Sequence, residues 1–84
     1  MVVRTIKTNV QEADNIMDNK LSFIFRSDKE RYMPGDVIQF LCMKDRCSTL
    51  HRINNKSFVV TTVLDSMTAP IISGFQLIGI RKMV

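Results

Sequence analysis

The chain of 84 residues lacks the long apolar runs that mark membrane and secreted proteins. A transmembrane helix needs ~20 consecutive apolar residues, and even the uncharged stretch 66–80 contains polar residues and Pro70. The first residues, MVVRTIKTN, contain no apolar segment of the kind that a signal peptide carries. We therefore expect a cytoplasmic protein that does not associate with a membrane.

Cysteine and histidine are scarce, with Cys42, Cys47 and His51 the only examples. Small secreted domains held by disulfides usually carry about four to eight cysteines, and a structural zinc site needs about four ligands. The three residues are close enough in sequence for a three-ligand site. The simpler interpretation is a small apolar strand residue at Cys42 and a free loop thiol at Cys47. We predict no metal and no cofactor.

Signatures of catalysis are also missing. The three glycines are isolated, so no glycine-rich phosphate loop is present. The sequence shows no local arrangement of Ser, His and Asp or of Cys and His. The eight acidic residues lie on an expected helix face, in expected turns or at strand ends, where solvated roles explain them. We predict no catalytic residue.

What the chain does contain is typical of one folded domain, residues 1–84. Apolar residues make up 45% and charged residues 24% of the chain, which is ordinary for a globular protein. The net charge is +4 and the isoelectric point is near 9.4. This positive charge permits attraction to polyanions such as nucleic acids.

The hydrophobic pattern predicts one helix among several strands. A first strand is expected over 2–7 and a helix over 9–18, where apolar residues recur at helical spacing. Thr8 is the expected N-cap hydroxyl, with Gln11 completing a capping box, and Asn19 is the expected left-handed C-cap. Period-two alternation then predicts a strand over 21–26.

The second half of the chain predicts three further strands. Met33-Pro34-Gly35-Asp36 fits a type II turn, and the strands are expected over 37–43, 56–65 and 74–81, with irregular polar segments between them. Gly79 inside the last strand indicates a bulge or a close backbone approach. The order β-α-β-β-β-β predicts an α+β, mainly β fold. About five strands with one main helix favour a small barrel, closed or nearly closed.

Basic residues gather near the second strand and the long loop. They are Lys20, Arg26, Lys29 and Arg31 on one side, and Arg46, Arg52 and Lys56 on the other. If both groups lie at one end of the barrel, they form a positive rim that binds phosphates. Phe23 and Phe25 share a face with Leu21, so the alternation assigns them to the core. Tyr32 and His51 lie in polar segments and are expected to be exposed.

The stretch NKLSFIFRSDKERYMPGDVIQF (19–40) resembles the front half of a small ASCH domain of the PUA-like superfamily, and GFQLIGIRK resembles the closing strand of that family. The resemblance implies a PUA-like barrel with a cleft, and the family is associated with RNA binding and modified-base recognition. The family signature Gly-x-Lys-x-x-Glu-x-Arg falls on Asn19, Leu21, Ile24 and Arg26, so only the arginine is retained. Lys20 lies one position early, and a one-residue offset on a strand reverses the face. A bulge would return it to the cleft.

Three functions follow as expectations. The favoured one is a module that binds RNA or a nucleotide-like ligand at the basic end of the barrel, with Arg26 as the phosphate or base-edge anchor. The second is an amidohydrolase acting on a modified nucleoside of the acylated cytidine type, which needs Lys20 in the cleft near a carboxylate. The third is a protein-interaction module, such as one from a phage or mobile element.

Overall fold

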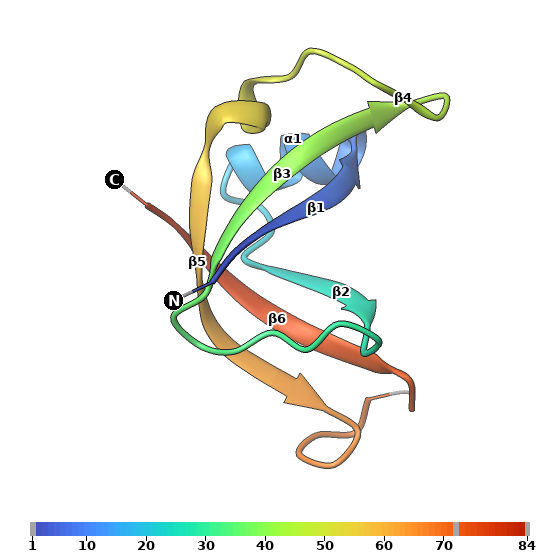
Figure 1. The fold of residues 1–84 in the computed structure, drawn as a ribbon, viewed down its shortest axis with the longest axis vertical. Coiled ribbons are helices and arrows are strands. Elements are labelled where there is room, and N and C mark those ends of the chain that lie inside the picture. The colour runs from blue at the N-terminus through green and yellow to red at the C-terminus, as the bar shows by residue number, and fades with distance from the viewer. Residues whose placement is uncertain (1, 72, 84) are drawn as a thin grey trace.

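The computed structural model describes residues 2–71 and 73–83. The elements in chain order are β1 (Val3–Asn9), α1 (Val10–Met17), β2 (Phe23–Ser27), β3 (Val37–Lys44), β4 (Cys47–Ser48), the 3₁₀-helix η1 (Arg52–Asn55), β5 (Ser57–Asp65) and β6 (Phe75–Lys82) (Figure 1). The predicted α+β, mainly β class is confirmed.

The strands form one six-stranded sheet in the order β1-β3-β5-β6-β2, with the short β4 added beside β3. β1 runs parallel to β3, and the other pairs are antiparallel. The barrel was predicted to be closed or nearly closed, and the sheet does not close, because β1 and β2 end the strand order without pairing with each other and run apart (Figure 1). In the gap between them, the Arg26 side chain on β2 donates to the Lys7 carbonyl on β1 over 3.2 Å.

The core lies on the face of the sheet that α1 and η1 cover. On β6 this face carries Gln76, Ile78 and Ile80, all buried, and Ile78 pairs in register with Ile24 of β2. The assignment of Phe23 and Phe25 to the core is therefore wrong. They alternate with Ile24 and point to the opposite face, where they are 43% and 53% exposed.

Tyr32 was expected to be exposed and is instead buried. Its ring lies 5.0 Å from the guanidinium carbon of Arg4, and its hydroxyl donates to Glu30 over 3.3 Å. His51, also expected to be exposed, has a side chain that is only 9% exposed. Both rings are buried although their neighbours in the sequence are polar. The polarity of the surrounding residues was therefore a poor guide to the exposure of Tyr32 and His51.

The helix begins one residue later than the Thr8 cap predicts. Asn9 is the N-cap, and its side chain accepts from the Glu12 backbone N–H over 2.7 Å. The Thr8 hydroxyl instead donates to the Glu12 carboxylate over 2.6 Å. The predicted left-handed C-cap is confirmed, since Asn19 has a φ of 60°.

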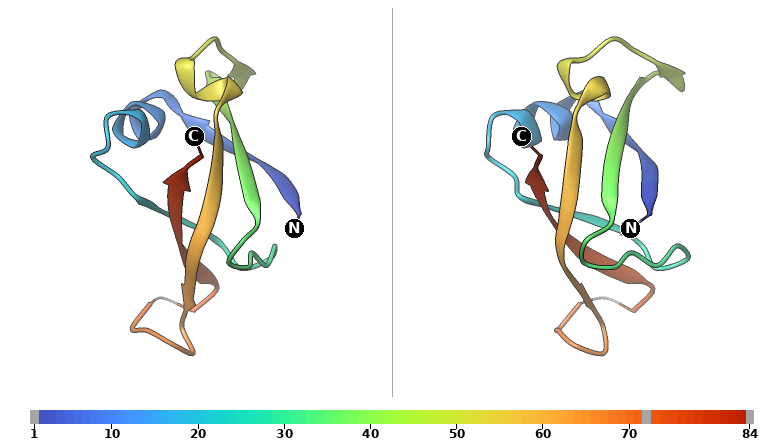
Figure 2. Two further views of the ribbon diagram at one scale, coloured as in Figure 1. Left: turned by 90° about the vertical axis from the view of Figure 1, so that its left-hand side faces the viewer. Right: turned by 60° about the vertical axis from the view of Figure 1, so that its left-hand side comes forward.

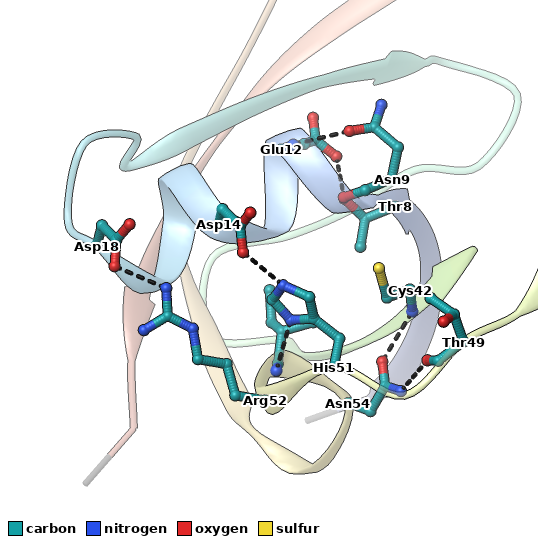
Figure 3. A network of polar contacts seen from close by, with 11 residues as sticks. Thr8, Asn9, Glu12, Asp14, Asp18, Cys42, Thr49, His51, Arg52 and Asn54 are labelled. Carbon is teal, nitrogen blue, oxygen red and sulfur yellow. Dashed lines mark hydrogen bonds and ion pairs between the residues drawn. The ribbon is translucent and has the colours of Figure 1, made fainter. Parts of the chain in front are cut away.

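The segment 44–55, expected to be irregular, is held in place by polar contacts. It contains β4 and η1, and it packs at the same end of the sheet as α1, opposite the turn between β5 and β6 (Figure 2). His51 Nε2 lies 2.7 Å from an Asp14 carboxylate oxygen, while His51 Nδ1 accepts from the Ile53 N–H (Figure 3). With Nδ1 accepting from the Ile53 N–H, Nε2 is the ring nitrogen that faces Asp14.

Two predicted backbone features are confirmed. Gly35 has a φ of 95°, and the Asp36 N–H donates to the Met33 carbonyl over 3.0 Å, which closes the predicted turn. Opposite Gly79, the register between β5 and β6 shifts between Val60 and Thr62. This is the predicted bulge.

Candidate functional site

Charge pairing divides the cationic residues into two sets. Four of the six arginines form ion pairs: Arg4 with Asp36, Arg26 with Glu12, Arg31 with Asp65 and Arg52 with Asp18. The other eight cations form no ion pair within residues 2–71 and 73–83: Lys7, Lys20, Lys29, Lys44, Arg46, Lys56, Arg81 and Lys82. These eight are the side chains available to an anionic ligand.

Arg26, the expected anchor, is occupied by protein acceptors. Its Nη2 lies 2.7 Å from Glu12 Oε1, and its Nη1 lies 3.3 Å from Glu12 Oε2. The same nitrogens also donate to the carbonyls of Lys7 and Phe25. Burial of the Glu12 carboxyl raises its pKa, but the hydrogen bonds from Arg26 and Thr8 and the charge of Arg26 outweigh burial and hold it below its usual value. Arg26 therefore joins β2, β1 and α1.

A groove of about 420 Å³ lies beside Arg26, and its lining carries both signs of charge. Lys7 and Lys29 supply positive charge, while Glu30 supplies a carboxylate. Burial, and then the neighbouring charge of Glu30, raise the pKa of Tyr32, which also lines this groove. With Arg26 already paired and Glu30 on the wall, the groove is poorly suited to a phosphate.

A second hollow, here called the α1–β6 cleft, has a lining without acidic residues. It measures about 260 Å³ and lies between the end of β6 and the residues at and just after the end of α1. Both elements can be found in Figure 2. Its lining residues are Ile16, Asn19, Leu21, Ser22, Phe58, Ile80, Arg81 and Lys82. Arg81 and Lys82 are exposed, and neither forms an ion pair within the described residues. The cleft therefore combines an apolar floor with concentrated positive charge.

Two of the predicted site residues lie next to this cleft. Lys20 is exposed between the lining residues Asn19 and Leu21. Lys56 is exposed and immediately precedes β5, where the Ser57 carbonyl accepts from the Met83 N–H. Two cations, Arg81 and Lys82, thus line the hollow, and two more, Lys20 and Lys56, lie within two residues of a lining residue in the sequence.

The structure places the other predicted residues elsewhere. Lys29 lies in the mixed groove with Arg26, Arg46 lies in the turn between β3 and β4, and Arg31 lies 3.7 Å from Asp65. Arg52 is bound to Asp18 over 2.7 Å, and this hydrogen bond is the main cause that lowers the pKa of the Asp18 carboxyl.

Arg81 and Lys82 are the residues that sequence reasoning missed. Their signal was the basic pair Arg-Lys at the end of an expected strand. Its importance depends on register, because Lys82 pairs with Phe58 and Arg81 pairs with Val59. The Ile80 N–H also donates to the Ser22 carbonyl over 2.9 Å, which places the basic pair beside the segment that follows α1.

The four positions on which the ASCH signature falls lie in different parts of the structure, although only Arg26 retains the signature residue. Asn19 and Leu21 line the cleft, whereas Ile24 is only 1% exposed and Arg26 binds Glu12. Among the described residues, the cleft lining contains no carboxylate, histidine or thiol. These lining residues supply positive charge and an apolar surface.

Neither the family models nor the curated proteins with which the chain was compared give a match. Within 2–71 and 73–83, His, Cys, Asp and Glu side chains nowhere gather in a group of three or more that could hold a metal ion. Cys42 is a buried residue of β3, as predicted, and Cys47 is an exposed free thiol, as predicted, but it lies in β4 rather than in a loop. No helix in the described part of the chain is long and apolar enough to span a membrane.

Proposed function

We propose that the protein binds RNA or a nucleotide-like anion at the α1–β6 cleft. The observation that carries this proposal is the lining itself, in which Arg81 and Lys82 face a hollow without a carboxylate. A guanidinium binds phosphate through two parallel hydrogen bonds, and a lysine adds a mobile point charge. Both groups are free of ion pairs within the described residues, so a phosphate would not have to displace an internal carboxylate.

The flanking residues favour a ligand with more than one phosphate. Lys20 and Lys56 extend the positive charge to either side of the cleft. Leu21 and Ile80 provide an apolar wall that suits a sugar or base edge. The resemblance of 19–40 to ASCH domains, whose superfamily is associated with RNA, supports the same choice of ligand.

The test is a fluorescence-anisotropy titration with a labelled single-stranded RNA of about ten nucleotides, a length within the range of single-strand binding sites. The cleft variant is Arg81→Gln with Lys82→Gln. Its matched control is Lys44→Gln with Arg46→Gln, which removes the same charge from the turn between β3 and β4. We expect the cleft variant to lose about tenfold or more in affinity, and the slope of log K against log salt to fall by about two.

Two results would contradict the proposal. One is equal loss of affinity in both variants, because the binding would then reflect net charge rather than a site. The other is no binding by the parent protein at low salt. In that case the cleft cations serve only to keep the surface charged.

A further inference from the structure

Three of the five phenylalanines lie on the surface, which is unusual for a residue that normally packs in the core. Phe23, Phe25 and Phe75 are 43%, 53% and 45% exposed. The other two, Phe40 and Phe58, are buried and meet edge to face with ring centres 5.3 Å apart. The core therefore has its own aromatic pair, and the exposed rings form a separate feature.

The three exposed rings share the outer face of β2 and β6. Phe23 and Phe25 alternate on β2, with ring centres 6.3 Å apart and planes at 89°. The register pairs Phe23 with Gly79, Phe25 with Leu77, and Ser27 with Phe75. Phe75, Leu77 and Gly79 are the alternate residues of β6 on that same face. We call Phe23, Phe25 and Phe75 the phenylalanine face.

One end of this face lies beside the α1–β6 cleft. Arg81 is the next alternate residue of β6 after Gly79, so it belongs to the outer face, and it is also one of the residues that line the cleft. Gly79 itself is buried against Thr61 and Thr62, so the rings and Arg81 are separated by these side chains. At the opposite end, Phe25 and Phe75 line an apolar hollow of about 400 Å³ together with Pro70 and Ile71. The sheet thus presents cations at one end and aromatic rings along the rest of the same strands.

We propose that the phenylalanine face is a stacking platform for the bases of a single-stranded RNA whose phosphates occupy the α1–β6 cleft. Sheet-borne aromatic rings stack unpaired bases, while adjacent cations hold the backbone. This inference rests on the proposed function and adds the ligand class: unpaired bases rather than a duplex or a free phosphate. A duplex hides its base faces inside the helix and leaves nothing for the rings to stack on.

Charge and ring type favour this ligand over a protein partner. Beyond Gly79 the same face carries Arg81, and Lys82 follows it in the sequence; neither forms an ion pair within the described residues, and both complement a phosphate backbone. All three of its side chains are flat rings, and each offers a π-face on which a base of any sequence can stack. Replacement of phenylalanine by leucine separates the two cases, because leucine keeps the apolar contact and removes the stacking surface.

The experiment compares three probes on the same proteins: the single-stranded RNA, a duplex of the same sequence, and inorganic tripolyphosphate, which has no base. The variants are Phe23→Leu, Phe25→Leu and Phe25→Trp, with Leu50→Ala as the control, since Leu50 is 98% exposed away from the face. We expect each leucine variant to lose about fivefold or more for the single strand. Phe25→Trp and Leu50→Ala retain the parent affinity or exceed it, and tripolyphosphate binds all the proteins equally.

The outcomes separate this inference from the proposed function. Suppose both leucine variants bind the single strand as tightly as the parent, while Arg81→Gln/Lys82→Gln still loses binding. That result would overturn the stacking platform, but the proposed binding at the α1–β6 cleft would stand. The stacking platform would also be overturned if the parent protein bound the duplex and the single strand with equal affinity. If no probe binds the parent, both proposals fail. A concentration-dependent dimer that Phe25→Ala abolishes, without any effect on RNA affinity, would assign the face to a protein contact instead.

Discussion

The guanidinium of Arg26 holds the carboxylate of Glu12 through both of its terminal nitrogens, with contacts of 2.7 and 3.3 Å. Arg26 lies on β2, at one end of the strand order, and Glu12 lies in the first turn of α1. The same guanidinium donates to the Lys7 carbonyl on β1, the strand at the opposite end of that order. One side chain therefore links the two edge strands of an open sheet to the helix, and it satisfies backbone acceptors that an edge strand would otherwise leave open.

Arg26→Ala is expected to destabilise the fold by about 1–3 kcal/mol, because it removes the cationic partner of the partly buried Glu12 carboxylate, which keeps only the Thr8 hydroxyl as a side-chain donor. Urea denaturation measures this as a lower midpoint at an unchanged slope. Lys29→Ala is the matched control, since Lys29 lines the same groove without an ion pair within the described residues. An unchanged midpoint with weaker RNA binding would instead assign Arg26 to the ligand.

The Glu12 pair also predicts how stability depends on pH. The pKa of Glu12 is lowered in the folded state, so its contribution is complete above the unfolded value of about 4.3 and is lost as the pH falls through the lower folded value. Glu12→Gln should be less stable than the parent at neutral pH, and the difference should shrink below about pH 4.3.

Urea midpoints measured from neutral to acidic pH test this dependence. Asp45→Asn serves as the control, because Asp45 is exposed and forms no ion pair within residues 2–71 and 73–83. A gap between Glu12→Gln and the parent that stays constant at every pH would show that the carboxylate charge contributes nothing.

The order of most elements could be predicted from the sequence because local chemistry determines them. Apolar residues at helical spacing predicted α1, and residue type predicted a positive φ at Asn19 and Gly35. A glycine inside a strand predicted the bulge opposite Gly79. Which face of β2 is buried could not be predicted in the same way. Alternation separates Phe23 and Phe25 from Ile24, but the pairing of Ile24 with Ile78 of β6 decides which set enters the core.

Neither the open sheet nor the pairing of Arg26 with Glu12 could be predicted from the sequence, for a related reason. Both depend on contacts between residues distant in sequence. A basic residue at a strand end looks the same whether it meets a phosphate or a carboxylate, and Glu12 lies fourteen residues away. The α1–β6 cleft likewise exists only because β6 pairs with β5, which brings Arg81 and Lys82 to the end of α1.

Gly79→Ala is expected to destabilise the protein by about 1–3 kcal/mol through overpacking. A β-carbon at this position would lie 2.8 Å from both Thr61 Oγ1 and Thr62 Cγ2, where β5 bulges against β6. The measurement is a double-mutant cycle by urea denaturation. The cost of Gly79→Ala should fall clearly when Thr61→Ala and Thr62→Ala are already present, and an equal cost in both backgrounds would exclude this steric explanation.

The two cysteines should react at very different rates with a thiol reagent. Cys42 is fully buried, and burial, followed by the charge of Asp14, raises the pKa of its thiol, whereas Cys47 is exposed. The thiolate is the reactive form, so the folded parent should show one fast thiol, and Cys47→Ser should show none. Comparable rates for the two thiols in the folded protein would mean that β3 is not buried.

Access to Cys42 should depend on Asn54, which ties the segment before η1 to β3. Its side chain accepts from the Cys42 N–H and donates to the Thr49 carbonyl, both over 2.8 Å (Figure 3). In the Cys47→Ser background, Asn54→Ala leaves the buried Cys42 N–H without a partner, at a cost of about 1–3 kcal/mol. Because this cost favours opening of the segment, Cys42 should react about fivefold faster or more. Asn55→Ala, at the exposed neighbouring position, is the control. Equal reaction rates in these two variants would show that the Asn54 bridge does not hold the segment closed over β3.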